Sequence, residues 1–197
     1  SDKRIGYEFL YPGCGYGGSC FPKDVNALIG TAKKLSHNSM LLKAVNLTND
    51  KQKIYLFSKM KKYFKNNLKG KTIGVWGLSF KPNTNDIRYA PSIEMIKLIL
   101  ENKASVLAYD PIASLKEEPK IYGHKLYNET KNYSQAIKNV DALLICTEWK
   151  EFWSIDTSLF VKSMKKPVIF DGRNIYPLDK FAGTGIKYFG IGRNHED

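Results

Sequence analysis

Apolar and polar positions follow two different patterns along this chain, and the change falls near Lys71. Before that residue, apolar side chains recur at the three- and four-residue spacing of amphipathic helices. After it, short apolar runs alternate with amphipathic stretches, which is typical of strands alternating with helices. The pattern therefore divides the chain into a helical segment, residues 1–70, and an α/β segment, residues 71–197.

Two helices are predicted in the helical segment. The first follows Lys23, where Asp24 is well placed to cap the first turn. The second runs from Met40 to about Leu68 without proline or glycine, as one long helix or two. Gly70 provides a common helix stop just beyond it.

Five short apolar runs predict the strands of the α/β segment, and residues 92–100 form the clearest helix between them. The runs are TIGVWG, ASVLAYD, DALLIC, PVIFDG and IKYFGIG. Their alternation with helices predicts a Rossmann-like, doubly wound parallel sheet, so the fold class is α/β. Ligands bind at the carboxyl ends of the strands in such sheets. Polar or charged sequences stand at those ends, namely LSFKPNTNDIR, YDP, TEW and DGR.

Composition places the protein among soluble globular chains, with 43% apolar and 25% charged residues. No apolar run is long enough to span a membrane, and the first residues lack an apolar secretion core. The three cysteines form no zinc pattern and cannot all pair, which suits free thiols in a reducing compartment. We therefore expect a cytoplasmic protein without a membrane partner.

The formal net charge of +12 favours an anionic partner. Nucleic acid, an acidic membrane surface and a phosphorylated metabolite all satisfy that charge, and a solvated basic surface explains it without any partner. No nucleic-acid-binding motif accompanies the charge, so we expect no nucleic-acid partner. The three histidines are scattered without ligand spacing, and no metal site is predicted.

The most reactive candidate is Cys20, which ends the glycine-rich loop YPGCGYGGSC at residues 11–20. Because a helix is predicted to begin directly after it, the helix dipole and Lys23 both favour the thiolate. The loop glycines remove side-chain bulk and let backbone N–H groups approach a substrate. A small buried cysteine beside a structural glycine turn is the alternative.

The segment GYGGSCFPKD resembles the thiol motif of the UDP-glucose and GDP-mannose dehydrogenase family. Four further motifs, GLSFKPNTNDIR, YDP, ICTEW and IFDGR, follow in the order that this family shows, so the resemblance covers the whole chain. It implies NAD-dependent oxidation of a nucleotide sugar at C6 in two hydride transfers. Cys20 would form a thiohemiacetal and then a thioester. Asp24 would position the hydrolytic water, and Lys23 and Arg88 would lie at the cofactor.

The resemblance also implies a set of substrate-binding residues drawn from the loop and the sheet. Arg4 resembles an arginine that reaches the sugar site of the partner subunit, which suggests a homodimer across the helical segment with a shared site. Residues 11–17 resemble a loop that wraps the nucleotide sugar, in which Cys14 has no evident chemical role. The implied substrate-binding residues are Arg4, Tyr11, Gly15, Tyr16, Gly17, Phe80, Lys81 and Arg173.

The glycines of GVWGLSF do not supply an NAD-binding fingerprint, because Gly74 and Gly77 do not fit G-x-G-x-x-G. By the resemblance, the α/β segment is the family's second Rossmann-like unit, and NAD is bound mostly by a preceding domain. We therefore expect the C-terminal part of a longer enzyme, inactive alone and without a general base of its own. Trp149 and Trp153 either stack on a base or pack against the sheet.

CFPKD together with ICTEW favours UDP-glucose as the sugar nucleotide, with UDP-glucuronate as the product. A GDP-mannose or UDP-N-acetylhexosamine dehydrogenase is the nearest alternative. A noncatalytic nucleotide-sugar-binding or dimerisation module, with a structural Cys20, is an alternative from another class.

Overall fold

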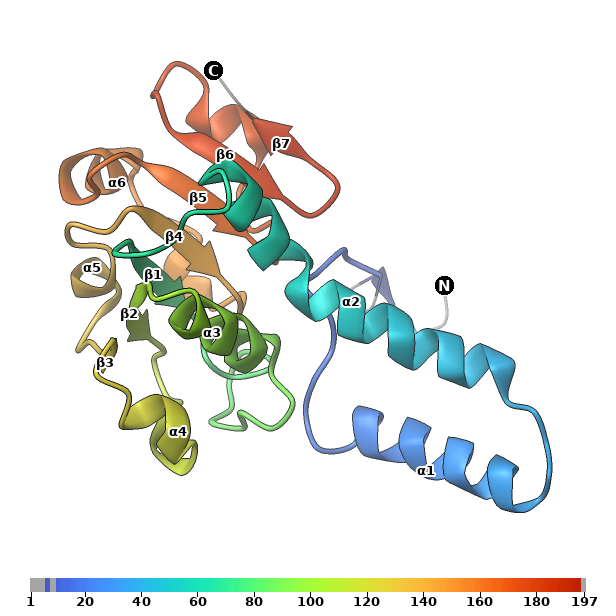
Figure 1. Ribbon diagram of the computed structural model, residues 1–197. Coiled ribbons are helices and arrows are strands. Elements are labelled where there is room, and N and C mark those ends of the chain that lie inside the picture. The colour runs from blue at the N-terminus through green and yellow to red at the C-terminus, as the bar shows by residue number, and fades with distance from the viewer. Residues whose placement is uncertain (1–5, 8–9, 196–197) are drawn as a thin grey trace.

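A seven-stranded sheet forms the centre of the protein in a computed structural model that describes residues 6–7 and 10–195 (Figure 1). The strand order is β3-β2-β1-β4-β5-β6-β7. Strands β1 to β6 run parallel, and β7 pairs antiparallel with β6. This arrangement is the doubly wound, Rossmann-like α/β fold that the sequence predicts.

All five predicted strands are present, and two very short strands, β3 and β7, were not predicted. They contain three and two residues, too few for a recognisable alternation of polar and apolar positions. The strands are β1 Thr72–Trp76, β2 Ser105–Tyr109, β3 Tyr127–Glu129, β4 Ala142–Ile145, β5 Val168–Asp171, β6 Lys187–Gly190 and β7 Asn194–His195.

The two predicted N-terminal helices exist with different ends. The first begins directly after Cys20 and its N-cap makes no side-chain hydrogen bond, so the expectation that Asp24 caps it is wrong. The second is one helix that ends five residues before Leu68, because Lys65 and Asn66 adopt left-handed φ values of 51° and 61°. The helices are α1 Phe21–Lys34, α2 Met40–Tyr63, α3 Pro91–Glu101, α4 Pro119–Tyr122, α5 Tyr133–Ala136 and α6 Thr157–Ser163.

Each face of the sheet has its own apolar core. On one face, α2 and α3 cover the strands, with Leu56 and Met60 of α2 fully buried against that core. On the other face, Trp76 stacks on Phe152 of the 3₁₀ segment Lys150–Phe152, and α5 and α6 complete the layer. The two layers hold the carboxyl edge of the sheet in a fixed geometry.

Gly74 within β1 and Gly77 directly after it serve packing. A Cβ on Gly74 would lie 2.5 Å from the Ala136 carbonyl oxygen, and one on Gly77 would lie 2.4 Å from the Thr147 side chain. Neighbouring elements therefore occupy the space that a side chain would need.

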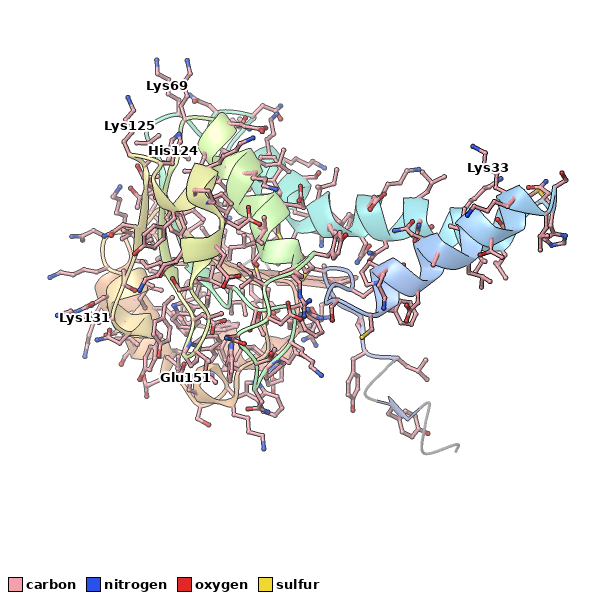
Figure 2. All side chains as sticks on the ribbon, turned by 90° about the horizontal axis from the view of Figure 1, so that it is seen from below. Lys33, Lys69, His124, Lys125, Lys131 and Glu151 are labelled. Atoms are coloured by element: carbon pink, nitrogen blue, oxygen red, sulfur yellow. The ribbon has the colours of Figure 1, made fainter. Side chains whose placement is uncertain are left out.

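Helix α2 joins the sheet to a projecting helical pair. Its C-terminal half packs on the sheet, whereas its N-terminal half extends away beside α1 (Figure 1). Figure 2 shows the same projection from another side, with Lys33 labelled near its far end. None of the helices in the described ranges is long and apolar enough to cross a membrane.

Candidate active site at the Cys20 loop

The Cys20 side chain is exposed at the start of α1, while Cys14 and Cys146 are buried. Its carbonyl oxygen accepts a hydrogen bond from the Asp24 backbone N–H at 2.8 Å, and its thiol does not cap the helix. The Ser19 hydroxyl lies 3.7 Å from its sulfur. The thiol therefore has the accessibility that a nucleophile requires.

Gly17 and Gly18 let this loop pack closely on the turn that follows β1. A Cβ on Gly17 would lie 2.4 Å from the Tyr89 carbonyl oxygen, and one on Gly18 would lie 2.8 Å from the Phe80 ring. The Gly18 N–H donates to the Arg88 carbonyl at 2.8 Å. Only residues without a side chain allow this approach, so the glycine spacing places the loop directly against the sheet edge.

Polar side chains of α2 hold the other side of the loop. The Tyr16 N–H donates to Asn49 Oδ1 at 2.8 Å, and Asn49 Nδ2 donates to the Tyr16 carbonyl at 3.1 Å. Gln52 Nε2 donates to the Gly13 carbonyl at 2.6 Å. The sequence analysis missed both α2 residues, although amide side chains on a long predicted helix were an available signal.

Arg173 is largely buried at the carboxyl edge of the sheet, where protein groups bind its guanidinium. Nε donates to the Cys146 carbonyl at 2.8 Å and lies 3.1 Å from Glu148 Oε2. Nη2 donates to the Phe80 carbonyl at 3.2 Å, and Nη1 would lie 3.0 Å from a Cβ on Gly13. One guanidinium thus links two strand ends to the thiol loop.

The other residues that the sequence predicts for the site differ in how exposed they are. Lys81 is exposed, with Nζ 5.4 Å from the centre of the Phe80 ring. Lys23 and Asp24 pair with each other at 3.3 Å on the surface of α1. Tyr11 is 70% exposed at the start of the loop. Gly15 packs against Asn49 and Lys53 with a left-handed φ of 99°, and Arg4 lies outside the described residues.

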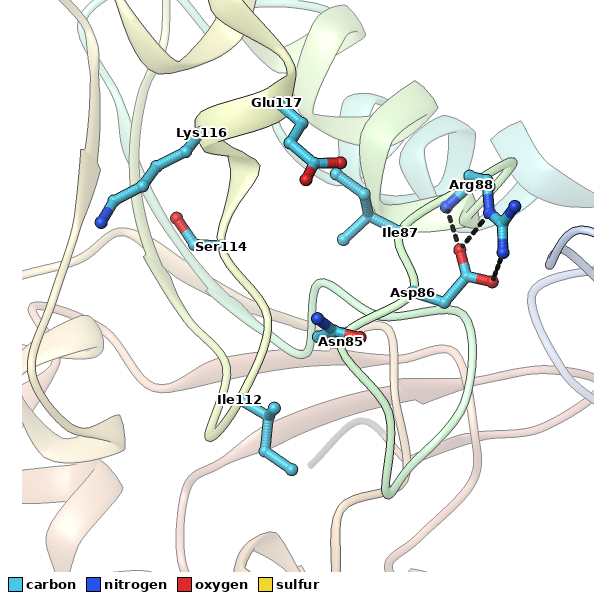
Figure 3. Close-up of a pocket in the computed structure, with 8 residues that line it drawn as sticks. All are labelled: Asn85, Asp86, Ile87, Arg88, Ile112, Ser114, Lys116 and Glu117. Carbon is cyan, nitrogen blue, oxygen red and sulfur yellow. Dashed lines mark hydrogen bonds and ion pairs between the residues drawn. The ribbon is translucent and has the colours of Figure 1, made fainter.

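A cavity of about 460 Å³ lies beyond the carboxyl ends of β1 and β2 (Figure 3). Arg88 and Lys116 bring positive charge to it, and Asp86 and Glu117 bring negative charge. Arg88 forms a forked ion pair with Asp86, with Nε–Oδ1 at 2.9 Å and Nη2–Oδ2 at 2.8 Å. Hydrogen bonds from Arg88 hold the pKa of Asp86 below its usual value. The lining residues are Asn85, Asp86, Ile87, Arg88, Ile112, Ser114, Lys116 and Glu117.

Asp110, in the YDP motif, orders the loops of this edge and was not singled out from the sequence. Its Oδ2 accepts hydrogen bonds from Leu78 N at 2.7 Å, Ser79 N at 3.1 Å and Trp149 Nε1 at 3.0 Å. Trp149 is buried in the sheet core, so of its two expected roles the structure shows packing. Trp153 is 50% exposed. Within the described ranges, no cluster of three or more His, Cys, Asp or Glu could hold a metal ion.

Two family models match the chain. The UDP-binding domain of the UDP-glucose/GDP-mannose dehydrogenase family matches residues 74–178, and the central domain of that family matches residues 1–51. The first model covers the sheet from Gly74 of β1 to the end of β5, whereas β6 and β7 lie beyond it. The second covers the thiol loop, α1 and the N-terminal half of α2.

Individual relatives give the same result. UDP-glucose 6-dehydrogenase of Pseudomonas aeruginosa is 42% identical over 197 residues, covering 98% of this chain and 43% of that protein. UDP-glucose 6-dehydrogenase TuaD of Bacillus subtilis is 42% identical over 98% of this chain and 41% of that protein. The solved UDP-glucose dehydrogenase of Pyrobaculum islandicum is 30% identical, with a TM-score of 0.79 over 96% of this chain and 41% of that one. This chain spans less than half the length of these relatives.

Proposed function

Because the chain belongs to the UDP-glucose/GDP-mannose dehydrogenase family, we propose that it carries the thiol and part of the nucleotide-sugar site of an NAD-dependent dehydrogenase. The proposed reaction oxidises C6 of UDP-glucose from alcohol to carboxylate and gives UDP-glucuronate. The observation that carries the proposal is the exposed Cys20 thiol, held at the start of α1 by a loop that packs on the carboxyl edge of the sheet.

Cys20 supplies the nucleophile of the second oxidation. Once the alcohol has lost one hydride and one proton, the thiolate adds to the aldehyde carbon and forms a thiohemiacetal. Loss of a second hydride and a proton leaves a thioester, which water cleaves to the carboxylate and the free thiol. Asp24, on the first turn of α1, positions that water. The thiol therefore retains the aldehyde until it is fully oxidised.

The nucleotide sugar lies between the thiol loop and the edge of the sheet. The Phe80 ring, which faces Gly18, forms an apolar wall, and the exposed Lys81 ammonium offers charge to a diphosphate. Arg173 contributes from the same edge, where its guanidinium also binds the Cys146 and Phe80 carbonyls. Tyr11, Gly15, Tyr16 and Gly17 supply the loop that surrounds the ligand.

Two cations and two carboxylates line the cavity beside Arg88, so the proposed contact with a phosphate group of the cofactor is assigned to the exposed Arg88 guanidinium and not to the cavity as a whole. Arg88 and Lys23 are the residues proposed to contact NAD. NAD, when bound, supplies the hydride acceptor.

A homodimer in the cytoplasm is the proposed assembly. The projecting α1–α2 pair exposes large apolar side chains, which a second copy of the pair would cover. A noncatalytic dimerisation module would present the same surface. Measurements of thiol reactivity and of nucleotide binding therefore distinguish such a module from the proposed dehydrogenase. Arg4 would reach the neighbouring site in such a dimer.

UDP-glucose is preferred over GDP-mannose and UDP-N-acetylhexosamines because the 42% identical relatives are named UDP-glucose 6-dehydrogenases. A solved UDP-D-ManNAc dehydrogenase from Pyrococcus horikoshii is less similar, at 27% identity and a TM-score of 0.75. Competition between UDP and GDP for the protein tests this choice of base.

Isothermal titration calorimetry of the folded protein tests nucleotide binding. We expect UDP-glucose and UDP to bind more tightly than GDP. Lys81→Ala should weaken UDP binding by about tenfold or more, since a charge-assisted contact contributes ~1.5–3 kcal/mol. Lys125→Ala removes the same charge just before β3, at the opposite edge of the sheet, and should leave binding unchanged. A folded sample that gives no heat with either UDP ligand contradicts the proposal.

A further inference from the structure

Lysine side chains gather at the amino edge of the sheet, where the parallel strands begin. The entry of a strand is its first residue together with the three residues before it. Because β1 to β6 run parallel, their six entries lie side by side at this edge. Five of the six entries contain lysine, and the exception is that of β4. The lysines of this row are Lys69, Lys71, Lys103, Lys125, Lys165, Lys166 and Lys187.

The lysine row extends along the whole parallel part of the sheet. The strand order places Lys125 at one end, before β3, and Lys187 at the other end, in β6. Adjacent strands lie about 4.8 Å apart, so the row is about 24 Å long. Five of its lysines are exposed and two are partly exposed. Figure 2 shows Lys69 and Lys125 at this end of the sheet domain, with Glu151 at the opposite end.

Few carboxylates balance these charges. Asp141, in the entry of β4, lies 3.5 Å from Lys71 Nζ and 2.9 Å from Lys165 Nζ. Glu101 ends α3 at the same edge. Within the described ranges, the other five lysines of the row form no ion pair. The amino edge therefore keeps a net positive charge.

Helix termini account for only part of this excess. Lys103 and Lys165 follow the C-termini of α3 and α6, where the helix dipole favours a cation. Lys69 and Lys187 lie beyond the last turn of the helices that precede them. Like charges gathered on one edge also repel one another, which disfavours the compact state. The row therefore holds more charge than helix capping requires.

The chemistry of the row favours a flat anionic surface as its partner. Its cations are all lysines, which act as point charges and lack the fork with which arginine recognises a single phosphate. None of the large apolar side chains exposed in the described part of the chain lies at a strand entry. The edge thus offers neither a stacking platform for bases nor an apolar anchor for a protein. Lys65, after α2, and Lys138, after α5, extend the charge onto both helix layers.

We propose that the amino edge binds the anionic surface of a lipid membrane through the lysine row. The contact is electrostatic and peripheral, so it requires no spanning helix. It replaces the expectation of no membrane partner, which rested on the lack of a long apolar run. The thiol loop packs at the carboxyl edge, on the opposite side of the sheet, so the docked protein keeps its candidate site open to solvent.

Vesicle co-sedimentation tests this proposal. Vesicles of phosphatidylcholine alone are compared with vesicles that also contain phosphatidylserine, at low and at high salt. We expect the protein to pellet with the phosphatidylserine vesicles at low salt only, because salt screens exposed charges. The neutral vesicles should leave it in the supernatant. Equal binding to both kinds of vesicle, or binding to neither, overturns the proposal.

Two matched triple variants test whether the lysine row makes the contact. The row variant combines Lys69→Gln, Lys125→Gln and Lys166→Gln. It should bind phosphatidylserine vesicles about a hundredfold more weakly, since each lysine at an anionic surface contributes about fivefold. The control variant removes the same charge from exposed positions elsewhere, with Lys33→Gln, Lys131→Gln and Lys150→Gln, and should bind as the wild type does. Equal losses in the two variants would show that net charge alone acts, which overturns the assignment to this edge.

Competing polyanions test the choice of partner. A random oligonucleotide and polyglutamate are added to the vesicle assay, and stronger binding of either one overturns the choice of a lipid surface. Calorimetry with UDP measures the proposed function separately, and the row variant should bind UDP as the wild type does. Circular dichroism establishes that each variant is folded. The comparison of the two kinds of vesicle with wild-type protein holds whether or not the variants fold.

Discussion

Asp110, Asp141 and Asp171 each lie at an end of a parallel strand and accept hydrogen bonds from the backbone of neighbouring segments. Asp171 is fully buried, and its Oδ1 accepts a hydrogen bond from the Arg173 backbone N–H at 2.8 Å. This bond fixes the backbone position from which the Arg173 side chain extends. Asp141 accepts from Thr72 N at 2.9 Å at the amino edge. At the scale of single residues, these carboxylates fix the backbone at the strand ends, and Asp171 fixes the segment that carries Arg173.

Asp141 should make stability depend on pH. Burial alone would raise the pKa of Asp141, but hydrogen bonds from Lys165 and Thr72 hold it below the usual value. A lowered pKa stabilises the fold above the unfolded value, about 3.9, and the effect is lost as the pH falls through the folded value. Asp141→Asn should cost about 1–2 kcal/mol at pH 7. Urea denaturation should show this gap closing below about pH 4; a gap independent of pH contradicts the assignment.

Helix α2 is the element that connects site and core. Lys53 and Asn49 are buried near the thiol loop, and Leu56, Phe57 and Met60 are buried near the sheet. A single rigid helix thus transmits the position of the sheet to the loop that carries Cys20.

Two substitutions on α2 should separate these roles. Asn49→Ala removes both hydrogen bonds to the Tyr16 backbone, so we expect about 1–3 kcal/mol lower stability and weaker UDP binding. Met60→Ala leaves a cavity in the core and should cost about 2–5 kcal/mol, with UDP affinity of the folded protein unchanged. Chemical denaturation and calorimetry on the same samples measure both quantities. Equal effects of the two variants on UDP affinity would contradict the division.

The whole molecule is a sheet domain with a helical projection (Figure 1). Large apolar side chains of that projection lie in solvent. Exposed large apolar side chains that are numerous on one projection suit a surface that another chain covers. The large apolar residues exposed on the projection and its connecting turn are Phe21, Leu28, Leu35, Met40, Leu41, Val45, Leu47, Ile54 and Tyr55.

Self-association through this projection is testable in solution. Leu41, 78% exposed on α2, should pack between copies, and Leu41→Asp should shift the protein from dimer to monomer. Val161→Asp, at a 48% exposed position on α6, makes the same change elsewhere and should leave the dimer intact. Size-exclusion chromatography with light scattering measures the mass. A wild-type monomer at all concentrations would disprove this interface.

Local patterns made much of this protein predictable. The period of apolar residues determined the two N-terminal helices and five strands, because helices and strands bury side chains with different repeats. Glycines at Gly17 and Gly18, followed by Cys20, favoured a bare loop ending in an accessible thiol but left a buried cysteine as the alternative; the structure shows the thiol exposed. Strands β3 and β7 were too short to leave a pattern, and the end of α2 depended on left-handed residues that are not glycine.

Contacts between segments far apart in the sequence decided how the thiol loop and Arg173 are held. Asn49 and Gln52 hold the loop, and Arg173 lies buried between strand ends, because chain segments far apart in sequence meet at the sheet edge. The forked pairing of Asp86 with Arg88 joins near neighbours, yet the place of this turn against the Gly18 backbone depends on the fold. Sequence determines which groups are available at each turn, since that depends on local propensity and periodicity. Tertiary structure alone determines which of them meet, because burial and long-range hydrogen bonds choose the partners.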